Sequence, residues 1–331
     1  MQQLSVPVAT MGERVLGIDV GGTKIASGLV DPAGRTEQLH RVRVEGRGEQ
    51  ALAQVVAVAR GYLERHPVAA VGVAVPGGVD PVSRTVVAAP NLGWTGLDLA
   101  GLLRAELGCA VTVENDGNAA AWAEHRFGAG AGSATTVLVT VGTGLGCGLV
   151  LGGRLHTGDR GLGGELGHLL LVPDGRACVC GSRGCWEQYA SGSALAAEAR
   201  DRGWSAAPFT AEDVLDAAAA DPVAAEVVDR VASRLAHGLT VLGACFDAGR
   251  ILLGGGLGTD PRFLGRVRAG LERIAPPSAV RTPVVVEAAA LGVAAGVIGA
   301  ADLAAAGFDR NVDTVRADGV PCHISSSRKQ S

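Results

Sequence analysis

Aromatic residues are scarce in this sequence: Phe, Trp and Tyr make up 3% of its 331 residues. The core must therefore be built from smaller apolar side chains, and 47% of the residues are hydrophobic, which is ample material. Fifty glycines indicate many tight turns and close backbone contacts. A chain of this length usually exceeds one compact core, so we expect two lobes.

Long apolar runs and clusters of basic residues are missing as well. The most apolar late stretch, Ala288–Ala300, spans 13 residues, whereas a membrane-spanning helix needs ~20. Residues 1–13 carry no basic segment followed by an apolar run, so we expect a flexible leader there and no secretory signal. The net charge of −4 is spread over mixed acids and bases. We therefore expect a cytoplasmic protein without a membrane or nucleic-acid partner.

Strand and helix patterns alternate along the chain, which predicts the α/β class. Apolar, β-branched residues predict a hairpin of strands Val15–Val20 and Lys24–Val30 around a glycine turn. The same opening returns at Thr136–Val141, Gly142–Gly144 and Leu149–Leu151. This recurrence suggests a duplicated α/β unit.

Helical spacing of apolar residues is clearest at Glu49–Leu63, and a long helix is predicted at 222–246. A shorter helix is predicted at Asn118–Phe127, directly after a strand at Val111–Val113. The polar residues 114–116 therefore lie between a predicted strand and a predicted helix.

The glycine-rich segment 128–133 is the candidate boundary between the lobes. We expect an N-terminal lobe over residues 14–130 and a C-terminal lobe, with a cysteine-rich loop, over residues 131–288. A final helix is predicted at 289–305. Residues 306–331 lack apolar periodicity, and we expect them to be disordered.

The turn of the first hairpin has residues suited to phosphate binding. Gly21 and Gly22 let backbone N–H groups approach a phosphate, while Thr23 and Lys24 add a hydroxyl and a positive charge. Asp19, just before the turn, can hold Mg²⁺ through water. The pattern is not a Walker A motif. The alternative is an ordinary glycine-rich hairpin turn.

The second hairpin repeats this turn chemistry with Thr143 and Gly144. One such turn in each lobe favours the binding of a nucleoside triphosphate over either turn alone. A third glycine cluster, Gly254–Gly256, follows a predicted strand at Ile251–Leu253. Gly255 and Gly256 either let a nucleoside approach the backbone or form a simple turn, and the sequence does not decide between these readings.

Glu114–Asn118 lies where a buried strand ends and a helix begins, which is where open α/β sheets place ligand groups. Asp116 can accept a proton from a substrate hydroxyl there. Asn115 can both donate to and accept from sugar hydroxyls. Asn, Asp and Gly are also the favoured helix-capping residues, so a capping role is the alternative.

One histidine and three cysteines form a compact set: His168, Cys178, Cys180 and Cys185. A Cys₃His set is a closed tetrahedral zinc site, and the glycines near the last two cysteines let the chain wrap around a metal. The alternative is three reduced structural thiols beside an unrelated histidine. Such a zinc would be structural. Glu165 and Glu187 flank the cluster and are either surface charges or ligand-binding residues.

Together these features resemble the ROK family of sugar kinases and sugar-responsive repressors, over residues 14–303. The motifs that carry the resemblance are Gly17–Lys24, Glu114–Ala119, Gly142–Gly144, Glu165–His168 and Cys178–Glu187. The last two are the most specific. The resemblance implies the actin/hexokinase-type (ribonuclease H-like) fold, with two α/β lobes around a cleft and the final helix returning to the first lobe.

The resemblance also implies residue roles for an ATP-dependent sugar kinase. Asp116 is the expected general base for the primary hydroxyl of the sugar, and His168 is expected to bind zinc and sugar with different ring nitrogens. The expected sugar-binding set is Gly77, Asn91, Asn115, Asp116, Glu165, His168 and Glu187. The expected surroundings of ATP and Mg²⁺ are Asp19, Gly21, Gly22, Thr23, Lys24, Thr143, Gly144, Gly255 and Gly256. The expected zinc ligands are His168, Cys178, Cys180 and Cys185.

Several alternatives stay open at this point. Cys185–Gly192 is most similar to the glucokinase branch, and a kinase for N-acetylglucosamine, N-acetylmannosamine or fructose is the nearest alternative. Polyphosphate is an alternative donor. A sugar-sensing repressor would carry a DNA-binding domain before the first hairpin, for which 14 residues are too few. Relatives are commonly dimers or tetramers, so a homo-oligomer is expected.

Overall fold

The computed structural model describes residues 14–205, 207–276 and 284–307. The leader predicted at residues 1–13 and nearly all of the tail predicted at 306–331 lie outside them. The chain forms two compact units. Unit 1 holds the described residues up to Ala123, the segment Thr157–Gly163 and those from Val293 onward; unit 2 holds the remainder. The chain passes from one unit to the other after Ala123, after His156, after Gly163 and after Gly292.

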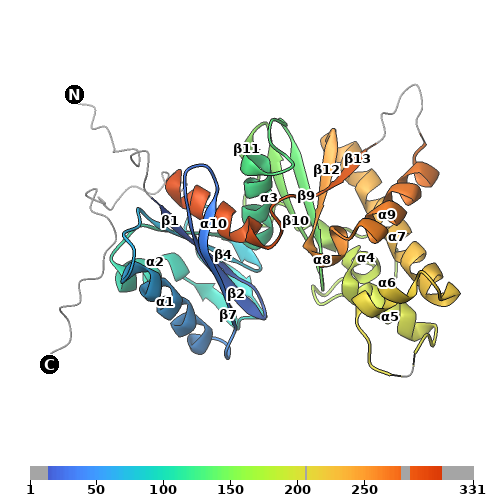
Figure 1. Ribbon diagram of the computed structural model, residues 1–331, viewed down its shortest axis with the longest axis horizontal. Helices are drawn as coiled ribbons and strands as arrows, with labels where there is room; N and C mark the ends of the chain where they lie inside the picture. Colours follow the sequence, from blue (N-terminus) through green and yellow to red (C-terminus); the bar gives the residue numbers. More distant parts are fainter. Residues whose placement is uncertain (1–13, 206, 277–283, 308–331) are drawn as a thin grey trace. The chain divides into compact units, whose positions relative to one another are not determined.

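Unit 1 is a five-stranded sheet with helices packed against it and a small three-stranded meander (Figure 1). The sheet strands, in spatial order, are β3 (Thr36–Arg43), β2 (Lys24–Val30), β1 (Val15–Val20), β4 (Val71–Val75) and β8 (Val111–Asn115). The meander consists of β5 (Gly78–Val79), β6 (Val86–Ala89) and β7 (Trp94–Leu97). The helices are α1 (Glu49–Leu63), α2 (Leu99–Leu107), α3 (Asp116–Phe127), which runs on into unit 2, and α10 (Ala295–Ala305).

Alternation along β1 explains how this sheet is covered. Leu16 and Ile18 are fully buried in a core that includes α1 and α2. Because successive side chains of a strand point to opposite faces, Gly17 faces the other way. A Cβ at Gly17 would overlap the carbonyl oxygen of Val297, and one at Gly72 of β4 would overlap that of Ala300. The glycines therefore let α10 lie directly on the sheet.

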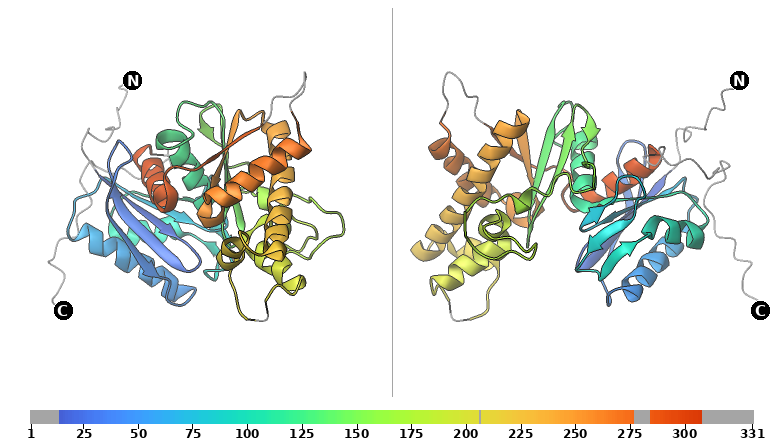
Figure 2. Two further views of the ribbon diagram at one scale, coloured as in Figure 1. Left: turned by 45° about the vertical axis from the view of Figure 1, so that its right-hand side comes forward. Right: turned by 180° about the vertical axis from the view of Figure 1, so that it is seen from behind.

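Unit 2 repeats the same sheet with different helices (Figure 2). Its strands, in spatial order, are β11 (Arg154–Leu155), β10 (Leu145–Leu151), β9 (Thr136–Val141), β12 (Arg250–Gly254) and β13 (Val285–Ala288). Its helices are η1 (Leu166–His168), α4 (Glu187–Ala190), α5 (Gly192–Asp201), α6 (Ala211–Ala217), α7 (Pro222–Phe246), α8 (Gly255–Gly258) and α9 (Pro261–Ile274). The 3₁₀ turn η2 (Gly292–Ala294) precedes α10.

The long helix α7 is the centre of the unit 2 core, against which α9 packs. Its start has clear sequence signals: Asp221 accepts hydrogen bonds from the N–H groups of Val223 and Ala224, and Pro222 occupies the first turn. Its end is marked by Asp247 in the left-handed region. No helix within the described residues combines the length and apolarity that a bilayer crossing requires.

The last helix begins later than predicted. Residues 289–291 of the predicted helix 289–305 are not helical, and α10 starts at Ala295 after η2. The reason is a fully buried carboxylate, Glu124, which accepts the N–H groups of Ala290 and Leu291 at 3.1 and 2.7 Å. It also accepts the N–H of Ala129 at 3.0 Å. These backbone donors are therefore satisfied outside a helix.

Candidate active site

In each unit the predicted nucleotide and proton-transfer residues lie where parallel strands end. In unit 1, β1 is parallel to β4 and β4 is parallel to β8, so their carboxyl ends share one edge. In unit 2, β9 is parallel to β12, so the turns after Val141 and Gly254 also share an edge. This is the edge at which α/β sheets bind ligands.

Asn115 and Asp116 mark the junction of β8 and α3. The Asn115 Oδ1 accepts the N–H of Asn118 at 3.0 Å, so Asn115 caps the helix, which is the capping role given above as the alternative. Its Nδ2 donates to the carbonyl of Gly77 at 3.0 Å, which brings two predicted sugar-binding residues together. Asp116 is part-exposed, and one carboxylate oxygen accepts the N–H of Gly117 at 2.8 Å. Capping and an accessible carboxylate therefore coexist at this junction.

Asp19 lies near Asp116 on the same edge. Burial, followed by the negative charge of Asp116, raises the pKa of Asp19 from 3.8 to about 7, against the opposing effect of Arg41. A Cβ at Gly296, in the first turn of α10, would lie 2.5 Å from the Asp19 Oδ2. The start of α10 is therefore directly beside Asp19. A carboxyl group destabilised in this way is suited to a cation that neutralises it.

The first glycine turn is open to solvent. The N–H of Gly21 donates to the carbonyl of Lys24 at 2.9 Å, while Gly22, Thr23 and Lys24 are exposed. A Cβ at Gly22 would lie 3.5 Å from the Cβ of Asn91, so the predicted sugar residue Asn91 adjoins the predicted phosphate turn. Arg47 fixes this loop by donating to the carbonyl of Asn91 at 3.1 Å.

The second glycine turn is braced from behind by α5. The N–H of Gly192 donates to the carbonyl of Gly142 at 2.8 Å, and that of Ser193 to the carbonyl of Thr143 at 3.1 Å. Thr143 itself is exposed. A Cβ at Gly255 would lie 2.5 Å from the Val141 carbonyl oxygen, so the third glycine cluster, with Gly255 and Gly256 exposed, is beside this turn.

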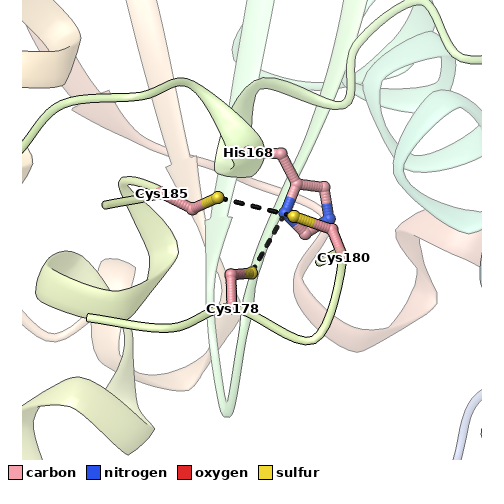
Figure 3. Close-up of side chains that lie close together, drawn as sticks. All are labelled: His168, Cys178, Cys180 and Cys185. Atoms are coloured by element: carbon pink, nitrogen blue, oxygen red, sulfur yellow. Dashed lines mark hydrogen bonds between the residues drawn. The ribbon is translucent and has the colours of Figure 1, made fainter. Parts of the chain in front are cut away.

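The four predicted metal ligands come together in unit 2 (Figure 3). Their ligand atoms all lie within 4.8 Å of one another. The Cys178 Sγ is 3.6 Å from the His168 Nδ1, and the Cys180 Sγ is 3.5 Å from the Cys185 Sγ. Tetrahedral zinc with Zn–S bonds of ~2.3 Å separates its ligand atoms by about 3.5–3.8 Å. The donor set and its spacing therefore fit zinc.

The loop that presents the cysteines is folded by its own backbone. The N–H of Cys178 donates to the carbonyl of Ser182 at 2.9 Å, and Gly181 adopts φ 90°. A hydrogen bond from the Ser182 backbone lowers the pKa of the Cys180 thiol to about 7. By contrast, Cys147 of β10 is buried among apolar residues, which raises the pKa of its thiol. Cys147 is thus a core residue.

Glu165, His168 and Glu187 connect this cluster to the rest of unit 2. The Nδ1 of His168 faces Cys178, and its Nε2 is 3.8 Å from the Glu165 Oε2. Glu187 follows Cys185 closely, and its Oε2 accepts the N–H of Leu145 at 2.9 Å. Leu145 directly follows the second glycine turn. Sequence reasoning gave no sign of this link between the cysteine loop and the turn.

Arg84 is a residue that sequence reasoning missed. It lies in the turn between β5 and β6, in no motif, and its side chain is 7% exposed. Its Nη1 donates to the Oε2 of the buried Glu114 at 3.0 Å. A buried arginine in a polar turn has no signature in a single sequence.

Two sheets of identical strand order, each with a glycine turn at its carboxyl edge, define the class of α/β proteins to which the hexokinase-type kinases belong. The ROK family model matches residues 15–306, nearly the whole described chain, and the chain belongs to the ROK family. The expected α/β fold of the actin/hexokinase type is confirmed.

Three relatives make this similarity specific. The glucokinase of Streptomyces coelicolor is 38% identical over 307 residues, which cover 87% of this chain and 96% of the relative. The crystal structure of a ROK family glucokinase from Streptomyces griseus, in complex with glucose and AMPPNP, is 39% identical with a TM-score of 0.81 and covers 89% of this chain and 100% of its own. An N-acetylmannosamine kinase of Yersinia pseudotuberculosis is 35% identical over 273 residues, 81% of this chain and 91% of the relative.

Proposed function

We propose that this chain is a glucokinase, which transfers the γ-phosphoryl group of ATP to the 6-hydroxyl of glucose and gives glucose 6-phosphate and ADP. The observation that carries the proposal is the part-exposed Asp116 carboxylate at the carboxyl end of β8, beside Asn115. The similarity to glucokinases, at 38–39% identity over most of the chain, supports glucose as the sugar.

Asp116 acts as the general base in this proposal. Its carboxylate accepts the proton of the 6-hydroxyl as the oxygen attacks phosphorus, and the P–O bond to ADP breaks. Asn115, Gly77 and Asn91 bind sugar hydroxyls or support the residues that do. Because Asn115 is held by Gly77 and Asn118, its amide has little rotational freedom, which favours one sugar orientation.

In unit 2, Glu165, His168 and Glu187 bind further sugar hydroxyls in this proposal. His168, Cys178, Cys180 and Cys185 would hold zinc, which would supply a structural crosslink. Zinc binding through the His168 Nδ1 would leave the Nε2 available to Glu165 or a sugar hydroxyl. The Glu187 carboxylate accepts the N–H of Leu145 beside the second glycine turn, so this proposed sugar-binding side chain and the turn are held together.

The two glycine turns and Gly255–Gly256 bind ATP in this proposal. Backbone N–H groups of Gly21, Gly22 and Gly144, with the side chains of Thr23, Lys24 and Thr143, contact phosphate oxygens. Asp19 would hold Mg²⁺ through water, and the ion would supply neutralisation of the phosphate charge. We also propose a cytoplasmic homo-oligomer, a dimer or tetramer.

The test is ADP release by the purified protein with Mg-ATP, over glucose, mannose, fructose, N-acetylglucosamine and N-acetylmannosamine. We expect the highest kcat/KM with glucose. Preference for N-acetylmannosamine would favour the alternative that the Yersinia relative represents and would overturn glucose as the substrate. Absence of turnover with every sugar, repeated with polyphosphate as donor, would overturn the kinase proposal.

A further inference from the structure

The ion pair between Arg84 and Glu114 is buried within unit 1. The Arg84 Nη1 lies 3.0 Å from the Glu114 Oε2, and the two side chains are 7% and 2% exposed. Charged residues are almost never buried to this degree unless they are paired, because both lose their hydration. Burial raises the pKa of Glu114, and its hydrogen bonds and the guanidinium of Arg84 oppose that rise.

The second oxygen of Glu114 organises the residues that the proposed function places at the chemistry. Its Oε1 accepts the N–H of Asn115 at 2.9 Å and the Nδ2 of Asn118 at 3.1 Å. Asn118 in turn donates its backbone N–H to the Asn115 Oδ1. The Asn115 amide is therefore fixed by an acceptor at Gly77 and a donor at Asn118, and the position of Asn118 depends on Glu114.

The turn that carries Arg84 is held in an unfavourable conformation. Arg84 has φ 58°, in the left-handed region that is unfavourable for a non-glycine residue. The turn is defined by Asp80, whose carboxylate accepts the N–H groups of Val82 and Ser83 and whose carbonyl accepts that of Arg84. The turn thus places an arginine at a position where glycine would be less strained, and the side chain of this arginine forms the ion pair with Glu114.

We propose that Arg84 is a positioning residue for phosphoryl transfer: its guanidinium holds the Glu114 carboxylate and, through it, the orientation of Asn115 beside the general base Asp116. The inference rests on the proposed kinase function. Arg84 touches neither sugar nor ATP in this proposal and acts through two hydrogen-bonded neighbours. Its loss should lower kcat more than it raises the KM for ATP, because the nucleotide turns are separate from this network.

The experiment compares Arg84→Gly, Arg84→Lys and Glu114→Gln with the wild type. Arg84→Gly relieves the backbone strain but leaves the Glu114 carboxylate buried without its partner, which lowers stability, so the double variant Arg84→Gly/Glu114→Gln, which removes both charges, is measured beside it. We expect kcat with glucose to fall about tenfold to hundredfold, with a change in the KM for ATP of less than about twofold. Arg84→Lys should recover part of kcat. The double variant Arg84→Gly/Glu114→Gln should be no worse than Arg84→Gly alone, because the two residues act as a unit.

Arg35→Met is the matched control, because it breaks an exposed ion pair of the same unit, with Asp31 at 2.7 Å. It should leave kcat unchanged. A folded Arg84→Gly variant with wild-type kcat would overturn the inference. A wild type that phosphorylates no sugar would overturn the proposed function instead. In that case the NMR resonances of the Asn115 side-chain amide decide the inference: they should shift in Arg84→Gly and stay in Arg35→Met, and unchanged resonances in both would refute it.

Discussion

The two units share one strand order but hold their candidate site residues in different ways. In unit 1, Asn115 and Asp116 come directly from the end of β8, and hydrogen bonds and the Arg84–Glu114 pair fix them. In unit 2, Glu165 and His168 lie in the long connection after β11, and Glu187 begins the four-residue helix α4. Residues at a strand end take their rigidity from the sheet, whereas residues on a long connection need an anchor of their own. The Cys₃His cluster is suited to that task.

A buried glutamate lies near the last strand of each sheet, and the two glutamates hold different parts of the chain. β8 and β13 occupy the same place in the two strand orders. Glu114 lies within β8 and holds Asn115 and Asn118 at the start of a helix. Glu124 comes from α3 and holds Ala290 and Leu291 just after β13, where the chain is about to leave unit 2. Equivalent strands thus adjoin candidate site residues in one unit and the exit of the chain in the other.

The largest expected difference between the two units is at Asp116. This carboxylate directly follows β8, whereas the residue after the equivalent strand β13 is Ala289, which cannot accept a proton. Asp116→Asn keeps the shape and removes the proposed base, so we expect kcat to fall by about 10²–10⁴-fold with no decrease in melting temperature. Steady-state kinetics with glucose and Mg-ATP measure this. Asp31→Asn, a turn aspartate of the same unit, should keep wild-type kcat. A kcat within threefold of wild type in Asp116→Asn would remove Asp116 as the base.

The anchor of unit 2 is broken by Cys180→Ser. The loss of one thiolate ligand should release zinc, and the loop that carries Glu187 should lose its order, so we expect the KM for glucose to rise at least about tenfold. Zinc per chain is measured by atomic emission. Cys245→Ser changes an exposed thiol on α7 and should retain zinc and activity. One zinc per chain in Cys180→Ser would contradict the predicted ligand set.

A smaller effect separates the two glycine turns. A Cβ at Gly144 would lie 2.5 Å from the Glu187 Oε2, so Gly144→Ala must displace that carboxylate from the N–H of Leu145. A Cβ at Gly22 would meet the Asn91 side chain at 3.5 Å, which is an ordinary contact. We expect kcat/KM for glucose to fall about fivefold to tenfold in Gly144→Ala and less than about twofold in Gly22→Ala. Equal losses in the two variants would show that Glu187 and the turn are not coupled.

Much of this architecture is predictable from local pattern. The strands Val15–Val20 and Lys24–Val30 and the helix Glu49–Leu63 have their predicted bounds, because apolar periodicity and turn residues mark them. The cysteine cluster is also predictable from local pattern, because three of its four candidate ligands are close in sequence.

What could not be predicted depends on contacts between distant segments. The meander β5–β7 has short strands with weak alternation, and its partners are defined only in the folded unit. Arg84 and Glu114 are 30 residues apart, and Glu187 and Leu145 are 42 apart, so no local window contains both partners. The late start of α10 likewise follows from Glu124, 166 residues before Ala290.

The last expected effect concerns stability, and not catalysis, at a pair of equivalent positions. Asp19 of β1 corresponds to Thr140 of β9, since each precedes the last residue of its strand and is followed by a glycine turn. The folded pKa of Asp19 is about 7 and its ordinary value is 3.8, so between these pH values the folded chain binds more protons than the unfolded chain. The contribution of Asp19 to the free energy of unfolding therefore decreases as the pH rises from about 4 to about 7.

Asp19→Asn removes this dependence and makes unit 1 resemble unit 2, which has an uncharged residue there. We expect the free energy of unfolding at pH 8, without Mg²⁺, to increase by up to about 4 kcal/mol, and the difference to vanish near pH 4. Urea denaturation at both pH values measures it. Asp80→Asn should do the opposite, because hydrogen bonds from Ser83 lower the pKa of Asp80 and its ionised form is stabilised by folding. A lower free energy of unfolding for Asp19→Asn than for the wild type at pH 8 would show that the surroundings do not destabilise the Asp19 carboxylate. Unit 1 would then carry no stability cost for the charge that is proposed to receive Mg²⁺.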